Sequence, residues 1–288
     1  MTTLYHYSSN KAFHSIIENR KIWLSSLSLS NDSMEGKLVA EILARIAKAD
    51  GLDQAATQRL QTLVSGLEQV IDGLGFCLSE DGDLLSQWRG YATDATGVSI
   101  GFSKNYLEQF AEGSRDQEKA GFTLQRVEYA PEAQESLIKP TYIEIKKLIN
   151  EGALKLPGRH SLLGDARSED EVKKDNEKIK GAFSRLSMTV LTLFGKLFLL
   201  KTSAFREERE WRLISYFVKT GDDMCSFRAL NDRIVPYREF ELPESEGGSI
   251  VKVILGPKNT TPNYVIESFL KQRGFRNVTI LRSEATYR

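Results

Sequence analysis

The sequence has few of the residues that build metal centres and disulfide scaffolds. Its 288 residues include two cysteines, Cys77 and Cys225, and three histidines, His6, His14 and His160. Two cysteines are too few for a disulfide framework or a cysteine-rich zinc site, and the histidines lack the spacing of zinc ligands. We therefore expect no zinc centre and no disulfide-stabilised fold.

An excess of charge of one sign is also missing. Lys and Arg total 39 and Asp and Glu total 39, so the formal net charge is zero at pH 7. Binding to duplex DNA rests largely on neutralising phosphates with Lys and Arg, so this balance argues against a dedicated nucleic-acid-binding protein. The hydrophobic content of 41% and charged content of 27% are ordinary for a globular protein and exclude wholesale disorder.

Long apolar runs are the third absence. The most apolar segment, residues 186–200, contains Ser, Thr, Gly and Lys and falls short of the ~20 residues that a membrane span needs. We expect it to form a buried helix. The first seven residues have neither the basic start nor the apolar stretch of a signal peptide. These features predict a cytoplasmic protein with no membrane partner.

The best-known catalytic motifs are missing as well. The sequence has no glycine-rich dinucleotide fingerprint, no P-loop, no His-Glu-x-x-His helix and no Gly-x-Ser-x-Gly elbow. The sequence therefore gives no support for the common classes of nucleotide-binding protein and hydrolase that these motifs mark.

Hydrophobic periodicity predicts an α+β protein of one domain over residues 1–288. Alternating or continuous apolar runs predict strands at 4–7, 22–25, 75–79, 98–102, 123–129, 211–217, 225–229, 233–237, 250–255 and 278–281. Helical spacing predicts helices after Ser9, within 34–46 and 60–71, near 84–91, over most of 131–200 and at 262–273. Strands separated by helical blocks of unequal length indicate a mixed sheet with a helical insertion at about 131–200.

The first candidate for chemistry is the segment Tyr5-His6-Tyr7-Ser8. On a strand, Leu4 and His6 share one face while Tyr5 and Tyr7 share the other. A strand-borne His followed by a hydroxyl residue can donate hydrogen bonds to a ribose or a carboxamide. The alternative is a core histidine with satisfied hydrogen bonds, flanked by tyrosines that pack.

The second candidate is the segment at 205–212. If a strand begins near Glu208, then Glu208, Glu210 and Arg212 project to one face, and Trp211 and Leu213 project to the core. Packing does not require two carboxylates and a guanidinium on one face. The alternative is an exposed strand edge held by salt bridges.

Three further features complete the candidates. Ser79 ends a buried strand, where sites open in sheets, and Trp88 and Tyr91 could stack on a planar ring or pack in the core. Lys201 precedes the glutamates and could meet a phosphate or one of their carboxylates. The Asn-Asp-Ser-Met-Glu segment at 31–35 is explained by a turn and a helix cap.

Together these segments resemble a widespread bacterial family of unknown function, the domain of unknown function numbered 2971. The matching pieces are Leu-Tyr-His-Tyr-Ser at 4–8, Trp-Leu-Ser at 23–25, Ser-Asn-Asp-Ser-Met-Glu at 30–35, Phe-Cys-Leu-Ser-Glu at 76–80, Gln-Trp-Arg-Gly-Tyr-Ala at 87–92, Gly-Val-Ser-Ile-Gly-Phe at 97–102, Lys201, Phe205, Glu208, Glu-Trp-Arg at 210–212 and Leu-Gly-Pro at 255–257. The resemblance spans nearly the whole chain and brings no established activity.

A looser resemblance is to the ADP-ribosyltransferase fold, which places a His on an early strand, a Ser or Tyr at the end of a middle strand and a Glu on a late strand. It implies a split mixed or antiparallel sheet with NAD, as the substrate, bound between its halves. The Glu208-x-Glu210 pair is similar to the paired-glutamate motif of some members. The sequence departs from that class, because His6 stands where the class has Arg and no paired tyrosines for nicotinamide are evident.

This second resemblance implies a role for each candidate. Glu210 would stabilise the oxocarbenium-like centre formed when the nicotinamide–ribose bond breaks, and Glu208 would act on the acceptor as a general base. His6 would position a ribose, Tyr91 or Tyr7 could stack on the nicotinamide, and Arg212 or Lys201 could neutralise the pyrophosphate. Ser8 and Ser79 would complete the residues that bind NAD.

The expected reaction is ADP-ribosyl transfer or plain NAD cleavage. The acceptor could be a protein side chain, a nucleic-acid base or water, and a bacterial toxin or anti-phage role fits the chemistry. Two alternatives stay open. One is a metal-dependent nucleotide or RNA-end hydrolase that uses the same glutamates. The other is a non-catalytic binding module in which these glutamates only pair with Lys or Arg.

Overall fold

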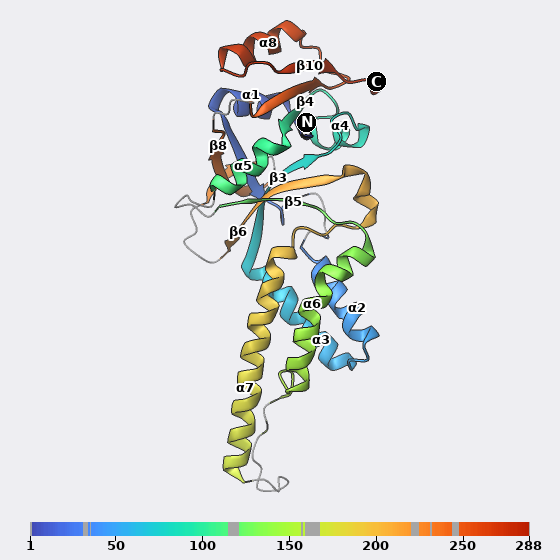
Figure 1. Cartoon of the computed structure of the whole chain (residues 1–288), viewed down its shortest axis with the longest axis vertical. Coiled ribbons are helices and arrows are strands. Elements are labelled where there is room, and N and C mark those ends of the chain that lie inside the picture. Colours follow the sequence, from blue (N-terminus) through green and yellow to red (C-terminus); the bar gives the residue numbers. More distant parts are fainter. Residues whose placement is uncertain are drawn as a thin grey trace. The chain divides into compact units, whose positions relative to one another are not determined.

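The computed structural model describes residues 2–30, 34, 36–114, 121–156, 158, 168–219, 225–230, 232–243 and 248–287 (Figure 1). The chain divides into two compact units. Unit 1 comprises Met1–Asn31, Asp72–Val127 and Ala204–Arg288, and unit 2 comprises Asp32–Ile71 and Glu128–Ser203. The helical insertion expected at about 131–200 falls in unit 2, which also takes in the two helices that precede residue 71.

Unit 1 is built on a mixed, open sheet, which confirms the expected α+β class. Its neighbouring strands run in the order β10-β9-β4-β1-β3-β2-β8-β7, and β6 pairs with β3 and β5. The strand β10 runs parallel to β9, while β1–β4 and β2–β8 are antiparallel. The bounds are β1 Thr3–Ser8, β2 Lys21–Ser26, β3 Ile71–Ser79, β4 Val98–Ser103, β5 Thr123–Arg126, β6 Glu210–Val218, β7 Ser226–Ala229, β8 Ile234–Glu241, β9 Ile250–Leu255 and β10 Thr279–Arg282.

The central strand β3 has short pairings with β1 and β2. Among the described residues, β1 meets β3 at the single pair Tyr5–Ser79, and β2 meets it at Ser25–Gly75 and the following pair. The imidazole of His6 lies at this short junction, where Nδ1 hydrogen-bonds the main-chain oxygen of Cys77 at 2.8 Å.

One face of the sheet carries the main hydrophobic core of unit 1. Alternate strand residues such as Leu4, Phe76 and Leu213 point into it. The helices α1 (Asn10–Asn19), α5 (Lys104–Ser114) and α8 (Asn263–Gln272) pack their apolar sides against it. Ser9 caps α1 by accepting a hydrogen bond from the Ala12 amide, at the start of the helix that the sequence predicts after Ser9.

The other face carries a smaller cluster beside α4 (Leu85–Tyr91). This cluster comprises Tyr7, Trp88, Ala92, Ala95 and Ile254. The two faces of β1 therefore differ, because Leu4 enters the main core while Tyr7 packs under α4.

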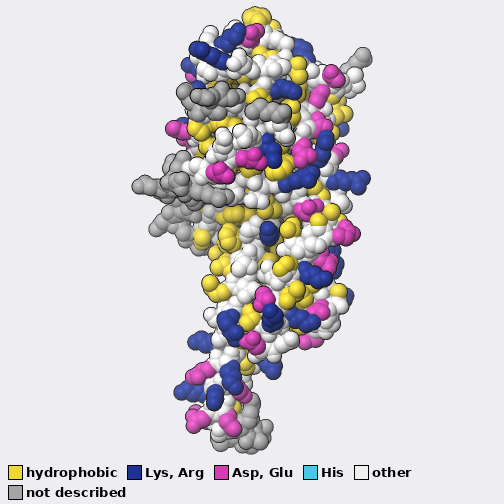
Figure 2. All heavy atoms as spheres, viewed as in Figure 1, with side chains coloured by type: hydrophobic (Ala, Val, Ile, Leu, Met, Phe, Trp, Pro, Cys, Tyr) yellow, Lys and Arg dark blue, Asp and Glu magenta, His cyan; other side chains and the backbone are white. Residues whose placement is uncertain are grey.

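Unit 2 is helical. It contains α2 (Leu38–Ala49), α3 (Gln54–Val70), α6 (Pro131–Asn150) and α7 (Glu169–Leu191), followed by a short 3-10 helix at Thr192–Lys196. The helix α2 packs on α3 and α6, and α6 packs on α7 (Figure 1). A capping box between Ser168 and Glu171 begins α7. Figure 2 shows charges of both signs interspersed along the lower part of the view, where α7 lies, as expected for a solvated helix.

Three sequence expectations need correction. The segment 186–200 is not one buried helix, because α7 ends at Leu191 and Met188 is 64% exposed. The strand expected to reach Tyr129 ends at Arg126, and Ile71 begins β3 instead of ending a helix.

No helix among the described residues combines the length and the apolar content needed to cross a membrane.

Candidate functional site

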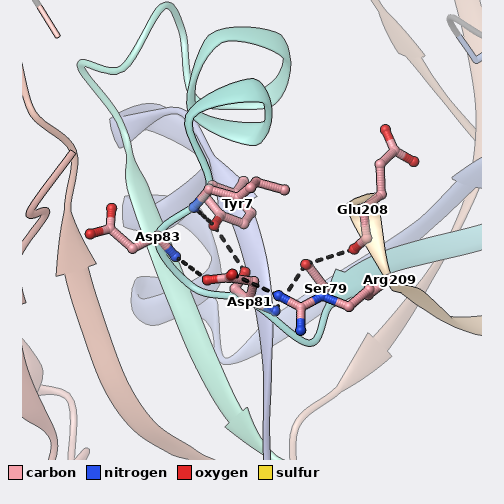
Figure 3. Close-up of polar contacts among 7 residues, drawn as sticks. Tyr7, Ser79, Asp81, Asp83, Glu208 and Arg209 are labelled. Carbon is pink, nitrogen blue, oxygen red and sulfur yellow. Dashed lines mark hydrogen bonds and ion pairs between the residues drawn. The ribbon is translucent and has the colours of Figure 1, made fainter. Parts of the chain in front are cut away.

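The loop that follows β3 is fastened to the segment that leads into β6 (Figure 3). Ser79 ends β3, and its hydroxyl donates to the main-chain oxygen of Glu208 at 2.7 Å. The Asp81 amide donates to the same hydroxyl at 3.1 Å, and the Glu80 amide donates to the oxygen of Arg209 at 3.2 Å. Ser79 therefore joins two segments that are far apart in the sequence, at the end of a central strand.

Tyr7 and Arg209 close this loop from two sides. The Tyr7 hydroxyl donates to the main-chain oxygen of Asp81 at 2.9 Å and accepts from the Leu84 amide at 2.8 Å. Arg209 Nη2 donates to Asp81 Oδ2 at 2.8 Å, and the Asp83 amide donates to Asp81 Oδ1 at 3.0 Å (Figure 3). The loop backbone is thus held in one conformation by groups from β1, from its own carboxylate and from the start of β6.

Glu208 lies just before β6 and not on it. It ends a 3-10 helix at Ser203–Glu208, and Arg209 takes a left-handed conformation with φ of 42°, so the strand begins at Glu210. The expectation that Glu208, Glu210 and Arg212 alternate along one strand is therefore wrong. The left-handed backbone at Arg209 takes Glu208 out of the strand alternation, and the two glutamates have different partners, Tyr91 for Glu208 and Arg212 for Glu210.

Glu208 and Tyr91 bring a carboxylate and an aromatic ring together. Glu208 is 8% exposed, and its Oε1 accepts from the Tyr91 hydroxyl at 3.3 Å. In Figure 3 the carboxyl group of Glu208 extends away from the Asp81 side chain. Tyr91 ends α4 and is 44% exposed, so one side of this pair reaches solvent.

Glu210 and Arg212 form a buried ion pair on β6. Arg212 Nε donates to Glu210 Oε1 at 2.7 Å, and Arg212 Nη2 donates to Oε2 at 2.8 Å. The two side chains are 6% and 1% exposed, so the alternative of an exposed, salt-bridged strand edge is wrong. The pKa of the nearby Tyr216 is raised by burial, and the positive charge of Arg212 opposes that rise. Arg212 is thus enclosed and bound to a carboxylate, which argues against a role on pyrophosphate.

His6 points into the main core. Its ring stacks on Phe76 with 4.0 Å between centroids, and its Nδ1 hydrogen-bonds the oxygen of Cys77. Burial, with the charge of Arg228, lowers the pKa of His6 to about 4, and the hydrogen bond to Cys77 opposes this shift. The imidazole is therefore neutral at pH 7, and the alternative of a satisfied core histidine fits it best. Ser8 shares this face and is 4% exposed.

His6 and Glu210 lie on opposite faces of the sheet. His6 alternates with Leu4 in the same core that receives Leu213, whereas Glu210 and Arg212 occupy the alternate positions of β6. This placement argues against one NAD molecule contacting both residues, and the shared binding of NAD by His6 and Glu210 stays a prediction.

The remaining predicted residues have different surroundings. Tyr7 is 5% exposed and packs edge-on against Trp88 with 4.9 Å between centroids, so its ring is not open for stacking. Trp88 is a core aromatic, one of the two alternatives, and donates to Asp83 Oδ1 at 2.7 Å. Lys201 belongs to unit 2 and is buried. Residues 31–33, 35 and 160 lie outside the described part of the chain.

The sequence analysis did not predict the role of the acidic loop, residues 80–83, that follows β3. Asp81 and Asp83 organise the segment between β3 and α4, and Asp83 also accepts from the Ser283 hydroxyl and from the Glu284 amide, the latter at 2.7 Å. The signal was present as Glu-Asp-Gly-Asp directly after a buried strand, where polar residues gather at a sheet end. In the described part of the chain, no three His, Cys, Asp or Glu side chains are grouped so that they could hold a metal ion.

Comparison with known proteins identifies one family. The model of the family described as "Protein of unknown function (DUF2971)" matches residues 87–213, which run from α4 to β6 and include Tyr91, Glu208, Glu210 and Arg212. No curated protein and no solved structure matches the chain. The match confirms, over residues 87–213, the resemblance to the DUF2971 family that the sequence indicates.

Proposed function

We propose that the protein cleaves the nicotinamide–ribose bond of NAD, in an ADP-ribosyl transfer or an NAD hydrolysis, with Glu208 as the essential carboxylate. The observation that carries the proposal is the difference between the surroundings of Glu208 and Glu210. Both oxygens of Glu210 are bound by Arg212 in a buried pair, whereas Glu208 is bonded to the half-exposed Tyr91. This difference in surroundings favours Glu208 as the residue that contacts a substrate.

The chemistry suits a carboxylate beside an aromatic ring. When the glycosidic bond breaks, its electron pair leaves with nicotinamide, which becomes neutral, and positive charge develops on C1′ and the ring oxygen of the ribose. A carboxylate next to this centre binds the transition state more tightly than the ground state. The Tyr91 ring would stack on the nicotinamide. An oxygen or nitrogen of the acceptor then bonds to C1′ and gives up its proton.

The acidic loop supports the proposal through rigidity. The oxygen of Glu208 is fixed by Ser79, and Arg209 is fixed by Asp81. The main chain of Glu208 and the following residue, Arg209, are therefore anchored to a central strand and to its loop. A carboxylate on such a support is preorganised, which electrostatic catalysis requires.

Nicotinamide release from NAD by the purified protein tests the proposal. We expect release by the wild-type chain and a fall of about 100-fold or more in Glu208→Gln, with Tyr91→Leu weakened to a smaller extent. Addition of cell extract would reveal whether a macromolecular acceptor is needed. Expression in bacteria should deplete NAD with the wild type and not with Glu208→Gln, as expected of a toxin or an anti-phage protein.

Glu210→Gln is the matched variant, since it removes the neighbouring carboxylate charge. The proposal expects the folded fraction of Glu210→Gln to keep its specific activity. No release by the wild type, with and without extract, would overturn the proposal. Hydrolysis of a nucleotide phosphate bond that is lost on addition of a chelator, without release of nicotinamide, would instead favour the metal-dependent hydrolase. Equal release by Glu208→Gln and the wild type would remove Glu208 from the chemistry.

A further inference from the structure

A second set of side chains occupies the same face of the sheet as Ser79. Opposed residues in antiparallel strands point to the same face, and residues two apart on one strand do so too. This face continues across β2, β8 and β7 through the opposed pairs Ser25–Gly75, Ser25–Tyr237, Trp23–Glu239, Ser226–Tyr237 and Arg228–Val235. Its members, from β3 to β7, are Ser79, Cys77, Gly75, Ser25, Trp23, Tyr237 and Arg228.

Part of this face reaches solvent, whereas Ser79 and Gly75 are buried. Trp23, Ser25, Cys77, Tyr237 and Arg228 are all partly exposed in the whole chain. The residues that alternate with them on β2 are fully buried in the main core on the other side. Aromatic and cationic side chains are thus presented here without being needed for that core.

Arg228 is the unusual member of this face. Its Nε is buried and has no hydrogen-bond partner among the described residues, and no carboxylate in the described part of the chain forms an ion pair with it. Its guanidinium carbon lies 5.7 Å from the ring centre of Trp23. Burial lowers the pKa of Arg228, which reflects the cost of removing a cation from water without a counter-charge.

The acidic residue nearest to this arrangement on the same face is already neutralised. Glu239 accepts from Lys21 Nζ at 2.7 Å and from Trp23 Nε1 at 3.1 Å. The Trp23 ring is in turn held against Tyr237 with 4.4 Å between centroids. Trp23 is therefore fixed by two contacts, and its ring supports the guanidinium. Such a guanidinium carries five donors in a fork that matches phosphate oxygens.

We propose that Arg228 binds a phosphate group of a nucleotide, with Trp23 and Tyr237 as the aromatic wall beside the nucleoside. The inference rests on the proposed function for the identity of the nucleotide. The diphosphate of NAD would then meet Arg228, on the face of the sheet that also carries Ser79. Arg228 then replaces Arg212 and Lys201, the residues that the sequence suggested for the pyrophosphate.

Binding of ADP-ribose tests the inference, because ADP-ribose has the diphosphate and is not consumed. Titration calorimetry in the Glu208→Gln background separates binding from cleavage. We expect Arg228→Gln to weaken ADP-ribose binding about tenfold or more and to flatten its salt dependence, with Arg228→Lys intermediate. Arg233→Gln is the matched control, since Arg233 lies on the same β7–β8 hairpin but is paired with Asp232.

A second arm identifies the ligand class. Trp23→Leu should weaken ADP-ribose and leave inorganic pyrophosphate unaffected, while Arg228→Gln should weaken both. Unchanged ADP-ribose affinity in Arg228→Gln would overturn the inference, and equal affinity for pyrophosphate and ADP-ribose would overturn the nucleotide assignment. ADP-ribose binding that depends on Arg228 in a protein that never releases nicotinamide would refute only the proposed reaction. Thermal melts check that each variant is folded.

Discussion

Arg212 holds both carboxylate oxygens of Glu210 from a position two residues further along β6, in a pair that is almost completely removed from solvent. Each charge has been taken out of water and is compensated by the other. Buried pairs of this kind add little net stability, but the loss of one partner leaves an uncompensated charge. The pair is therefore a structural unit, and the free energy of unfolding falls when one of its two charges is removed.

The first prediction is that Glu210→Gln destabilises the fold strongly. Because the guanidinium of Arg212 would keep its charge in a buried site, we expect the free energy of unfolding to fall by about 3–5 kcal/mol. Urea denaturation followed by circular dichroism measures this. The control is Glu144→Gln, which breaks the exposed Glu144–Lys147 pair and should have no measurable effect. Equal stability of Glu210→Gln and the wild type would contradict the burial of the pair.

The second prediction concerns pH and His6, whose pKa is lowered to about 4 by burial. The unfolded chain binds a proton near pH 6.5 that the folded chain binds only near pH 4. The contribution of His6 to the free energy of unfolding is therefore fully present above pH 6.5. It is lost as the pH falls from 6.5 to 4, which lowers the free energy of unfolding by at most about 3 kcal/mol.

Denaturation curves across this pH range in the wild type and in His6→Gln test the prediction. Gln can still donate to the Cys77 oxygen but does not titrate, so the variant should lose that share of the pH dependence. His14→Gln is the control, because His14 lies on α1 and stacks against Phe269. A His6→Gln curve parallel to that of the wild type would show that His6 titrates normally in the folded protein.

The sequence predicted the strands well where apolar residues alternate and poorly where the backbone depends on distant groups. The pattern at β9 was located to the residue. Arg209 was not foreseen, because its left-handed backbone is stabilised by Glu80 and Asp81 from a loop more than 120 residues earlier. That single residue moved Glu208 out of the strand and changed the reading of the paired glutamates.

The faces of the strands were harder to assign than their positions. Alternation correctly put His6 with Leu4 and apart from Tyr7, but it does not say which face of β1 carries the core. The helix α5 was missed although its buried residues Leu107, Phe110 and Ala111 have helical spacing. Arg228 was overlooked too, because only the strand registers bring it to the face of Ser79.

The third prediction is that Tyr7→Phe weakens the loop after β3. The hydroxyl accepts from the Leu84 amide and donates to the Asp81 oxygen, so its removal leaves two largely buried backbone groups unpaired. We expect a loss of about 1–3 kcal/mol in the free energy of unfolding. Tyr264→Phe is the control, because Tyr264 is 69% exposed. Equal losses in the two variants would mean that the hydroxyl of Tyr7 does not hold the loop.

The fourth prediction is that Gly97→Ala is poorly tolerated while Gly90→Ala is not. A Cβ at Gly97 would lie 2.1 Å from the main-chain oxygen of Ser8 and 3.0 Å from that of Ala92. Backbone atoms cannot step aside as a flexible side chain can, and the Gly97 amide and oxygen are themselves hydrogen-bonded to Ala92 and Gly256.

The cost should therefore reach at least about 2 kcal/mol, the range of overpacked cores, because β1 must separate from the turn that precedes β4. Gly90 is the matched control: it lies in α4, and a Cβ there meets nothing within 4 Å. Gly90→Ala should leave the melting temperature unchanged or raise it, since Ala favours a helix by about 1 kcal/mol over Gly. If Gly97→Ala and the wild type have the same melting temperature, β1 does not approach this turn as closely as its backbone contacts require.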